Sequence, residues 1–475
     1  METILRQLYQ YTFDTPPDTL SRLSPAGSNR IYYRLTKDTH SCVGVIGTSL
    51  TENRAFLYIA RHFAAKGLPV PHILAVSSDE RAYLQEDLGD QLLFDFIHEG
   101  RQTGCFSEEE KAILGSTIRR LAHLQIKGDQ SFDYTNCYPV PAFDQRSIMW
   151  DLNYFKYDFL KATGIEFQED ILEDEFQHLA HMLLAVNQMG FMYRDFQSRN
   201  VMIQEGQPYF IDFQGGRKGP LQYDVVSFLW QAKANFPQTL REELLDEYLD
   251  ELTTLTIFDK EAFKSILPFF VFFRTLQVLG AYGFRGYFER KAHFLQSIPF
   301  AIQNLIALLP QIEIEFPHIA SIIRQLANQE WETVTPHTHL QVRICSFSYK
   351  KGLPVDLTGN GGGFVFDCRA VHNPGRYAEY KSLTGQDLPV IRFLEENGEI
   401  HTFLEHVYSL VDASVERYIK RGFTDLMISF GCTGGQHRSV YAAQKTAEHI
   451  HNKYGVEVIL NHREQHIKHT FFSNT

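Results

Sequence analysis

The chain has 475 residues, 44% of them hydrophobic, which is enough for two to four folding units at roughly 150 residues each. Its formal net charge is −12, and 43 acidic against 30 basic side chains precede residue 339, so neither half has the basic surface that predicts nucleic-acid binding. Six scattered cysteines without a C-x-x-C pair exclude a disulfide framework or a zinc ribbon and favour a reducing compartment.

The amino-terminal thirteen residues mix acidic and basic side chains and contain no uninterrupted apolar core, unlike a secretory signal. We therefore expect a cytoplasmic protein. The most apolar window, residues 266–284, is interrupted by Pro268, Arg274 and Gln277 and falls short of the ~20 apolar residues that span a bilayer. We expect a buried helix pair in this window and no membrane partner.

In the first part of the chain, residues 31–35 and 41–46 are predicted to form a strand hairpin, followed by a helix over about 52–66. The apolar face of that helix contains Phe56, Ile59, Ala60 and Phe63. Strand-like sequence at 72–77 and 81–88 follows, and the chain then becomes predominantly helical. A small antiparallel sheet with one helix, followed by a helical lobe, indicates an α+β, protein-kinase-like fold with two lobes.

The clearest domain boundary in the sequence is the polar, proline-containing stretch 328–339. It separates a helical pattern from the next predicted strand. We therefore expect a domain over 1–330, a linker over 331–338 and a second domain over 339–475. In the second domain the predicted strands are 341–347, 363–368, 425–430 and 456–460, and the predicted helices lie within 390–421 and 439–454. Such alternation indicates an α/β domain with parallel pairing around residues 425–460.

Three oxygen-bearing side chains occur at the spacing that phosphoryl transfer requires. Asp195 is followed five residues later by Asn200, and Asp212 follows an apolar strand. Phosphoryl transfer needs a carboxylate for the attacking hydroxyl and oxygen ligands for magnesium. We assign Asp195 to the first role and Asn200 and Asp212 to the second, with a hairpin bringing Asp212 back beside the loop.

The alternative interpretation is a solvated acidic loop, since an Asp followed by an Asn at this spacing is common by chance. The ordered series of hairpin, helix, strand, catalytic loop and strand-borne Asp, continuing to Tyr223 and Asp224, favours the kinase interpretation.

Residues 1–330 resemble the aminoglycoside phosphotransferase superfamily, and within it the anomeric kinases that phosphorylate N-acetylmuramate and N-acetylglucosamine at C1. The matching stretches are 27–35, 68–74, 85–90, 193–202, 211–229 and 274–284. The resemblance implies ATP and Mg²⁺ as cofactors and an amino sugar as substrate. It places Asn29 and Arg30 over the ATP phosphates, and it places the backbone of Gln85, Glu86, Asp87 and Leu88 against the adenine.

The sequence departs from the superfamily at two places. The lysine of the third strand, which contacts the α- and β-phosphates, is replaced by the stretch 44–47, and Arg30 or Arg34 is the candidate substitute. In the catalytic loop, Tyr193 and Gln197 occupy positions where the superfamily usually has histidine. The candidates for sugar contact are Trp150, Asp151, Tyr154 and Phe155, for which an aromatic stripe facing the core is the alternative.

The stretch 431–439 is predicted to turn between a strand and a helix. Its glycines, Gly431, Gly434 and Gly435, let backbone N–H groups converge on an anion, and the helix start adds its positive end. His437 and Arg438 add charged donors, while Ser439 is a candidate helix cap that also contacts the anion. The stretch lacks the G-x-x-x-x-G-K-[ST] pattern of a Walker A loop.

Cys432 and Arg438 have the C-x5-R spacing of cysteine-dependent phosphatases, in which a thiolate of low pKa attacks phosphorus. Gly431 replaces the usual preceding histidine, and no acidic loop follows that would supply a general acid. A small buried cysteine is therefore the alternative interpretation.

Residues 339–466 resemble the C-terminal domain of the RNase adapter RapZ, which binds glucosamine-6-phosphate. The matching stretches are 346–356, 364–374, 382–390, 429–443 and 461–464. The residues that the resemblance places in a phosphosugar pocket are Asp367, Arg369, Asn373, Thr433, Gly434, His437 and Arg438. The departures are Gly375-Arg376 after the Asn-Pro pair, a tail without the family's basic ending, and a kinase-like domain in place of a P-loop domain.

The leading hypothesis from the sequence is an ATP-dependent amino-sugar kinase of cell-wall recycling, joined to a domain that binds a phosphorylated amino sugar. One alternative is an RNA-binding regulatory adapter with a degenerate kinase module, and another is a cysteine-dependent phosphatase. The oligomeric state is not indicated by the sequence.

Overall fold

The computed structural model describes residues 2–23, 30–289, 291–329, 331, 339–356, 358, 360, 362–396 and 398–473. The chain divides into two compact units, Met1–Ala281 with Ser297–Gln329, and Tyr282–Gln296 with Glu330–Thr475. The linker expected over 331–338 lies outside the described residues apart from Trp331.

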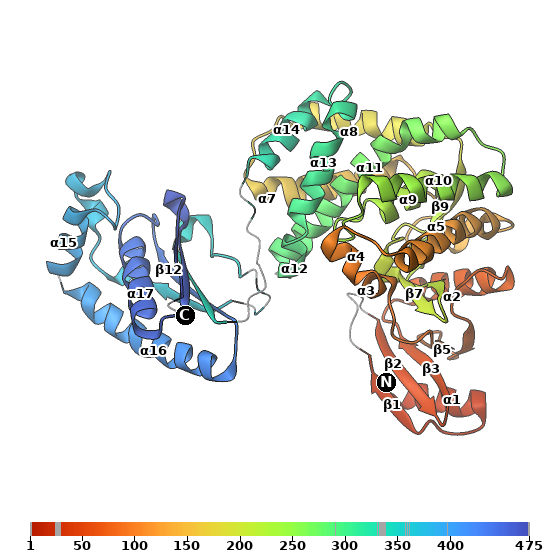
Figure 1. Ribbon diagram of the computed structural model, residues 1–475, viewed down its shortest axis with the longest axis horizontal. Coiled ribbons are helices and arrows are strands. Elements are labelled where there is room, and N and C mark those ends of the chain that lie inside the picture. Colours follow the sequence, from red (N-terminus) through yellow and green to blue (C-terminus); the bar gives the residue numbers. More distant parts are fainter. Residues whose placement is uncertain are drawn as a thin grey trace. The chain divides into compact units, whose positions relative to one another are not determined.

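The first unit begins with a five-stranded antiparallel sheet in the order β1-β2-β3-β5-β4. Its strands are β1 (Thr19–Arg22), β2 (Ile31–Lys37), β3 (His40–Ile46), β4 (Ile73–Val76) and β5 (Ala82–Glu86). The expected hairpin is β2 with β3, and the expected helix is α2 (Leu50–Ala65), which Ser49 caps through its side chain. This sheet forms the red and orange end of the chain in Figure 1.

Two elements at the start of the chain were not expected from the sequence, namely β1 and the helix α1 (Glu2–Phe13). Leu5 and Tyr9 of α1 are buried in one cluster with Leu35 and Leu84 of the sheet. The helix therefore closes one face of the sheet, because its apolar side chains would otherwise remain in water.

The helical part of the first unit follows the sheet along the chain. Its helices are α3 (Leu93–Phe96), α4 (His98–Thr103), α5 (Glu108–Asp129), α6 (Gln145–Tyr154), α7 (Lys161–Thr163), α8 (Glu169–Leu184), α9 (Leu221–Leu229), α10 (Gln238–Leu255), α11 (Lys260–Gly283), α13 (Ile298–Ile312) and α14 (Pro317–Ala327). Two small antiparallel ribbons lie within it, β6 (Met189–Met192) with β9 (Arg217–Pro220), and β7 (Val201–Gln204) with β8 (Gln207–Phe210). These ribbons hold the predicted catalytic segment, and the plan of small sheet and helical lobe confirms the expected kinase-like fold.

The expectation of a helix pair at residues 266–284 is wrong, because α11 continues through Pro268 as one helix and then passes into a π-helical segment, Phe284–Phe288. The fully buried side chains Phe270, Phe272 and Phe273 hold the helix in place despite the lost backbone donor. Lys260–Phe288 is long and apolar enough to cross a membrane by length and composition, but 61% of its most apolar window is buried within the protein. We interpret it as a core helix.

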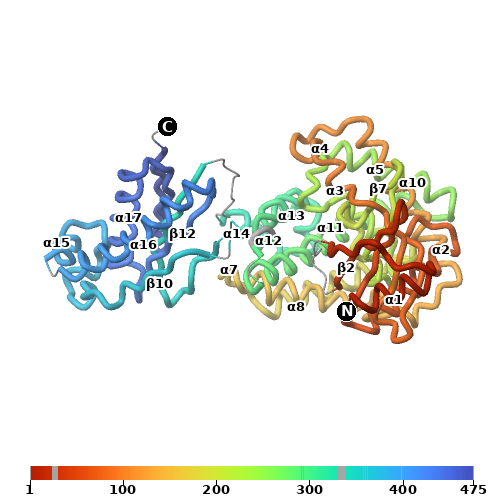
Figure 2. The backbone as a smooth tube through the Cα atoms, turned by 90° about the horizontal axis from the view of Figure 1, so that it is seen from below, coloured from red at the N-terminus to blue at the C-terminus, as the bar shows by residue number. Residues whose placement is uncertain are grey.

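The second unit contains a five-stranded sheet in the order β11-β12-β10-β13-β14. Its strands are β10 (Gln341–Ser348), β11 (Phe364–Asp367), β12 (Asp425–Cys432), β13 (Glu457–His462) and β14 (Ile467–Phe471), and its main helices are α15 (Leu388–Glu396), α16 (Glu399–Arg421) and α17 (Arg438–Tyr454). A short helix, α12 (Ala292–Leu295), belongs to the segment 282–296. Figure 2 traces the sheet and the main helices of this unit in teal to blue.

The parallel pairing expected around residues 425–460 is present, but β12 and β13 do not pair with each other. Both pair with β10, which lies between them in the middle of the sheet. The tail strand β14 was not expected; it runs antiparallel to β13 at the sheet edge.

Candidate functional site

One buried carboxylate, that of Asp224, holds the start of the predicted catalytic loop. Asp224 on α9 accepts hydrogen bonds from the backbone N–H groups of Tyr193, at 2.7 Å, and Arg194, at 2.8 Å. Burial raises the pKa of Asp224 to about 7, although these two N–H donors favour its ionised form. The Gln125 side chain contacts the same carboxylate at 3.3 Å. The loop therefore has a rigid start.

Tyr193 anchors the loop although it replaces the usual histidine. Its ring is fully buried, and its hydroxyl donates a hydrogen bond to the carbonyl of Ile211, the residue before Asp212. Its ring centroid lies 6.2 Å from that of Phe213. The tyrosine therefore connects the catalytic loop to the strand end that carries Asp212.

The structure brings the three predicted kinase residues together. The side-chain amide of Asn200 donates to the Asp195 carbonyl at 2.8 Å, and the N–H of Ile211 donates to the Asn200 carbonyl at 3.0 Å. The Asp195 side chain is 48% exposed, so its carboxylate can meet a hydroxyl that arrives from solvent. This geometry meets the requirement for a base beside two oxygen ligands.

Asp212 sits in a strained backbone position with φ of 68°. Its Oδ1 accepts a hydrogen bond from Gln214 Nε2 at 2.7 Å, and Gln214 Oε1 accepts one from Arg30 Nη1 at 3.0 Å. Burial, followed by the charge of Asp195, raises the pKa of Asp212. Gln214, which we did not predict as a site residue, thus links the carboxylate to a cation.

A carboxylate and an amide oxygen are suitable donors for Mg²⁺, so the chemistry of Asp212 and Asn200 fits the implied metal. Within the described part of the chain, no group of three or more His, Cys, Asp or Glu side chains is arranged to hold a metal ion. Any ion at this position therefore depends on Asn200 and on oxygens of the bound phosphates.

The two arginines proposed as substitutes for the missing lysine are placed differently. Arg30 is 5% exposed, pairs with Glu52 of α2 at 3.2 Å, and reaches Gln214. Arg34 instead pairs with Asp87 at 2.7 Å and with Asp90 at 2.9 Å. Only Arg30 is therefore connected to the group that carries Asp212. Asn29, its predicted companion, lies outside the described residues.

The predicted adenine-contacting segment lies at the end of β5. Gln85 pairs with Val43 of β3, Glu86 is the last residue of the strand, and Leu88 is buried. Asp87 is held by Arg34 and also accepts the N–H of Gly89 at 3.0 Å. The segment thus has a fixed backbone between the sheet and the helical lobe.

The candidates for sugar contact lie on α6 and at the start of the π-helical segment Phe155–Leu160 that follows it, and they separate into two groups. Asp151 is buried and pairs with Arg194 of the catalytic loop at 3.0 Å, and Trp150 is exposed. Phe155 is fully buried and packs against Phe159 with centroids 5.8 Å apart, so the core interpretation applies to it.

Sequence reasoning missed Arg274 as a site residue. It is 6% exposed, donates to Ser227 at 3.1 Å and lies 3.5 Å from Asp195 Oδ1. Arg274 lies in the stretch 274–284, which carried part of the family resemblance. The sequence therefore marked this residue, but it did not indicate that the residue lies beside Asp195.

In the second unit, four parallel strands end at the same edge of the sheet. The last residues of β10, β11, β12 and β13 are Ser348, Asp367, Cys432 and His462. Binding sites in open α/β sheets lie at the carboxyl ends of the strands. The loop 433–437, which we call the cradle, turns at this edge between β12 and α17.

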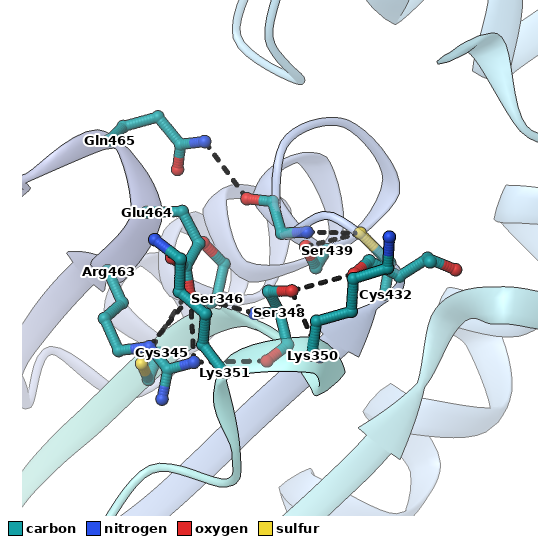
Figure 3. A network of polar contacts seen from close by, with 12 residues as sticks. Cys345, Ser346, Ser348, Lys350, Lys351, Cys432, Ser439, Arg463, Glu464 and Gln465 are labelled. Atoms are coloured by element: carbon teal, nitrogen blue, oxygen red, sulfur yellow. Dashed lines mark hydrogen bonds and ion pairs between the residues drawn. The ribbon is translucent and has the colours of Figure 1, made fainter. Parts of the chain in front are cut away.

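The cradle wraps around the Cys432 thiol (Figure 3). The Gly435 N–H donates to Cys432 Sγ at 3.2 Å, and the Ser439 hydroxyl lies 3.1 Å from the same sulfur. Burial opposes ionisation of this thiol, but the Ser439 contacts and the charge of Arg438 outweigh it, so the pKa of Cys432 lies below its ordinary value. The cradle therefore stabilises negative charge at its base.

The expectation that Ser439 caps the helix is wrong. The N-cap of α17 is His437, without a side-chain cap, and Ser439 instead turns toward the thiol. The reason is geometric: α17 begins one residue earlier than expected, which places Ser439 inside the first turn.

The other predicted anion ligands are placed as follows. Thr433 and Gly434 are exposed at the mouth of the cradle. Arg438 is buried, and its Nη1 donates to the carbonyls of Arg369 and Val371 at 2.9 and 2.8 Å. His437 contacts the Tyr380 carbonyl at 2.8 Å. Both side chains thus tie neighbouring loops to the cradle.

The remaining three predicted residues lie at the end of β11 and on the loops that follow it. Asp367 and Arg369 form an exposed ion pair at 2.7 Å, and the guanidinium lies 4.2 Å from the Tyr349 ring centroid. Asn373 accepts the N–H of Gly375 at 3.2 Å.

Four residues around the cradle were missed as site residues. Ser348 donates to the Thr433 carbonyl at 2.7 Å, and its N–H donates to Glu464 at 3.1 Å. Arg463 pairs with Glu464 at 2.8 Å, and Gln465 donates to the Gly435 carbonyl at 3.0 Å (Figure 3). Except for Gln465 they lie in stretches that carried the resemblance, so the sequence contained a signal for them.

The two-lobed fold and the carboxylates at its catalytic loop define a kinase-like phosphotransferase. Residues 19–262 match the phosphotransferase enzyme family, so the chain belongs to that family. Residues 340–466 match the RapZ C-terminal domain.

Curated relatives of the chain are named nucleotide-binding proteins. One from Glaesserella parasuis is 32% identical over 192 residues, covering 38% of this chain and 65% of that protein. One from Thermosipho africanus is 38% identical, covering 26% and 42%, and one from Nitrosomonas europaea is 40% identical, covering 26% and 41%. The chain thus spans less than two thirds of the length of these relatives.

Solved structures with similarity to the chain include the amicoumacin kinase hAmiN in complex with AMP-PNP and Ca²⁺, with a TM-score of 0.47 and 12% identity over 64% of this chain and 92% of that one. The choline kinase LicA from Streptococcus pneumoniae has a TM-score of 0.44 and 13% identity, covering 65% and 99%.

Proposed function

We propose that the first unit is an ATP-dependent kinase that phosphorylates a hydroxyl of a small molecule. The observation that carries this proposal is the half-exposed Asp195, which is held by Asn200 beside the strand end that bears Asp212. In this proposal Asp195 orients the acceptor hydroxyl and accepts its proton. Asn200 and Asp212 hold Mg²⁺, which when bound neutralises charge on the phosphates.

Asp195→Asn tests this proposal. The variant should keep its fold and its ATP affinity and lose about 10²–10⁴-fold in kcat, since the proton acceptor is removed. Asp250→Asn is the matched control. Asp250 is an exposed carboxylate on α10 whose salt bridge, among the described residues, is to Lys260. An Asp195→Asn variant with the turnover of the wild type would contradict the proposal.

For the acceptor, we infer an amino sugar, N-acetylmuramate or N-acetylglucosamine, phosphorylated at C1 during cell-wall recycling in the cytoplasm. The resemblance of 193–202, 211–229 and 274–284 to the anomeric sugar kinases supports this inference. Arg274 from the last of these stretches lies beside Asp195, which is consistent with a role near the acceptor.

For the second unit, we infer a binding site for a phosphorylated amino sugar at the cradle. Its support is the match to the RapZ C-terminal domain together with converging donors around Cys432. Kinase assays repeated with glucosamine-6-phosphate present would test whether the second unit regulates the first. A change in kcat or KM would support regulation, and unchanged kinetics in the presence of measured binding would restrict the second unit to binding.

A second candidate function for the cradle is phosphomonoester hydrolysis through the Cys432 thiolate. It is favoured by the lowered pKa of Cys432 and by Ser439, which lies where it can support a thiolate leaving group. Hydrolysis of p-nitrophenyl phosphate by the wild type and its loss in Cys432→Ser would support it. Activity that survives in Cys432→Ser would contradict it.

A further inference from the structure

The first unit contains a cavity of about 510 Å³ that the proposed kinase function does not use. Its walls come from α10, α11 and α13, which are labelled in Figure 1, and from Trp230, the residue that follows α9. Within the described part of the chain, all its lining residues lie outside the catalytic loop. A cavity of this volume between helices is typical of a site for a small organic molecule.

Part of the cavity wall is apolar. Leu267 and Val271 of α11 and Leu308 of α13 line the cavity, and each is more than nine-tenths buried. Leu245 of α10 adds a fourth aliphatic side chain. Apolar surface is favourably removed from water when an apolar molecule covers it, so the cavity offers a packing surface to the apolar part of a ligand.

Arg241 of α10 brings a positive charge to the same cavity. Its guanidinium lies 5.5 Å from the Trp230 ring centroid, and its Nη2 reaches Asn304 Oδ1 of α13 at a long 3.5 Å. The amide nitrogen of Asn304 donates to the Trp230 carbonyl at 3.2 Å, which orients this contact. The Nε of Arg241 is buried and has no hydrogen-bond partner among the described residues. An aromatic ring and an amide therefore hold the guanidinium.

The carboxylates that line the cavity have other partners. Asp246 pairs with Lys264 at 2.8 Å, and Glu242 accepts a hydrogen bond from Gln238 at 2.7 Å. Burial lowers the pKa of Arg241, and no charge among the described residues offsets this effect. A partly buried cation without a counter-ion is unfavourable, so an anion that binds beside Arg241 would be stabilised.

We propose that this cavity is a second binding site of the first unit and that it takes a small organic anion with an apolar body. The anionic group lies at Arg241, and the apolar body packs on Leu267, Val271 and Leu308. The site is separate from the groups that the kinase proposal assigns to the nucleotide and to the acceptor hydroxyl, because none of those groups lines the cavity.

Two contacts connect the cavity to the catalytic loop. Gln231, the residue after Trp230, accepts hydrogen bonds from the N–H of Ser198 at 3.2 Å and from its hydroxyl at 2.7 Å. On α11, the cavity lining ends about one turn before Arg274, which lies 3.5 Å from Asp195. A ligand in the cavity is therefore placed to regulate phosphoryl transfer without contacting its substrates.

A pair of matched fluorescent probes tests the proposal. Anilinonaphthalene sulfonate is an apolar molecule with one anionic group, and phenylnaphthylamine has the same rings without the sulfonate. Both probes become more fluorescent in apolar surroundings, so titration of the full chain gives both dissociation constants. We expect the anionic probe to bind at least about tenfold more tightly, as for a charge-assisted contact. Equal dissociation constants would overturn the proposal.

Two arginine variants show where the anionic probe binds. Arg241→Met removes the charge and keeps an apolar side chain of similar length, so it should abolish the preference for the anionic probe. Arg324→Met is the matched control, because Arg324 is an exposed arginine of α14 that pairs with Glu313. A preference that survives in Arg241→Met, or that Arg324→Met also abolishes, would place the anion elsewhere and overturn the proposal.

Ala307→Trp provides an independent test, because it fills the cavity without changing its charge. Ala307 lines the cavity on α13 and is exposed, so the larger side chain should leave the fold unchanged. The variant should bind the anionic probe at least about tenfold more weakly and keep KM for ATP and for the sugar. Unchanged probe binding would overturn the proposal.

A raised KM for the sugar in Ala307→Trp would show that the cavity is part of the acceptor site, and it would overturn the proposal of a second site. The probe titrations do not depend on turnover. They therefore test the cavity even if no sugar is phosphorylated.

Discussion

At the scale of single residues, Asp224 determines how the catalytic loop is held. Its carboxylate accepts the N–H groups of two successive loop residues, Tyr193 and Arg194, although the side chain is completely buried. An ionised carboxylate accepts such bonds best, whereas burial favours the neutral acid. The loop is therefore sensitive to the protonation of this one group.

This conflict predicts a pH dependence of stability. The pKa of Asp224 is raised from 3.8 to about 7 in the folded protein, so the folded state binds a proton that the unfolded state has lost. The stabilisation from Asp224 is present below pH of about 4 and is lost as pH rises through about 7. Asp224→Asn stays neutral throughout, so the wild-type advantage in unfolding free energy should shrink between pH 5 and pH 8. Urea titrations of the wild type and of Asp224→Asn at pH 5 and pH 8 measure this advantage. A difference in unfolding free energy that does not change with pH would contradict the raised pKa of Asp224.

Arg30 and Arg34 provide a paired test of nucleotide binding. Arg30 reaches Asp212 through Gln214, whereas Arg34 is occupied by Asp87 and Asp90. Arg30→Met should raise KM for ATP by roughly ten- to a hundredfold, the effect of a lost charge-assisted contact. Arg34→Met should raise it less, and steady-state kinetics that rank the two variants in the opposite order would refute this assignment.

The placement of Asp195, Asn200 and Asp212 side by side was predictable, because it depends on local spacing and on one hairpin. The link through Gln214 was not predictable, since it depends on a contact with a residue far away in the chain. Gln214 matters only because Arg30 folds onto it. Such pairings leave no periodic signal in a single sequence.

At the scale of secondary-structure elements, α1 should contribute to the stability of the sheet lobe. Leu5 is completely buried against the sheet, whereas Ile4 on the same helix is 42% exposed. Leu5→Ala should lower the free energy of unfolding of this lobe by about 2–5 kcal/mol. Ile4→Ala should change it by about 0.5 kcal/mol or less. Urea unfolding of the two variants makes the comparison, and equal losses would show that α1 does not pack as described.

Two neighbouring glycines of the cradle, Gly434 and Gly435, provide a second matched comparison. Gly435 has φ of 66°, and a Cβ there would lie 2.4 Å from Glu464 and 2.8 Å from the Ser348 nitrogen. At Gly434 a Cβ would meet no described atom within 4 Å. Gly435→Ala should therefore abolish binding of glucosamine-6-phosphate, because strain and collision distort the loop.

Gly434→Ala is the control and should retain binding, because its methyl group points into open space. Calorimetric titration of both variants measures the difference. Retained binding in Gly435→Ala would show that the cradle backbone is not the anion site.

The strands and helices with clear periodicity were predictable, including β2, β3, α2 and the alternation of the second unit. Three features were not. Helix α1 is held by the packing of Leu5 and Tyr9 on the sheet, β14 pairs only at the sheet edge, and Pro268 suggested a break that tertiary packing overrides. The wrong helix cap at Ser439 has a similar cause, since helix ends shift by one residue under tertiary contacts.

At the scale of the whole molecule, the chain joins a unit of the phosphotransferase enzyme family to a unit that matches the RapZ C-terminal domain. Each unit has its own sheet. We propose that the first unit makes an amino-sugar phosphate and that the second unit binds one. The second unit then binds a metabolite that is chemically similar to the product of the first. This connection depends first on the chemistry of the kinase unit.

The most direct test is phosphorus NMR of the intact protein incubated with ATP, Mg²⁺ and either N-acetylmuramate or N-acetylglucosamine. The proposed function predicts a new phosphomonoester signal coupled to the anomeric proton, with ADP formed in equal amount, and its absence in Asp195→Asn. ATP that remains unconsumed with both sugars, or a phosphate attached to another hydroxyl, would contradict an anomeric amino-sugar kinase.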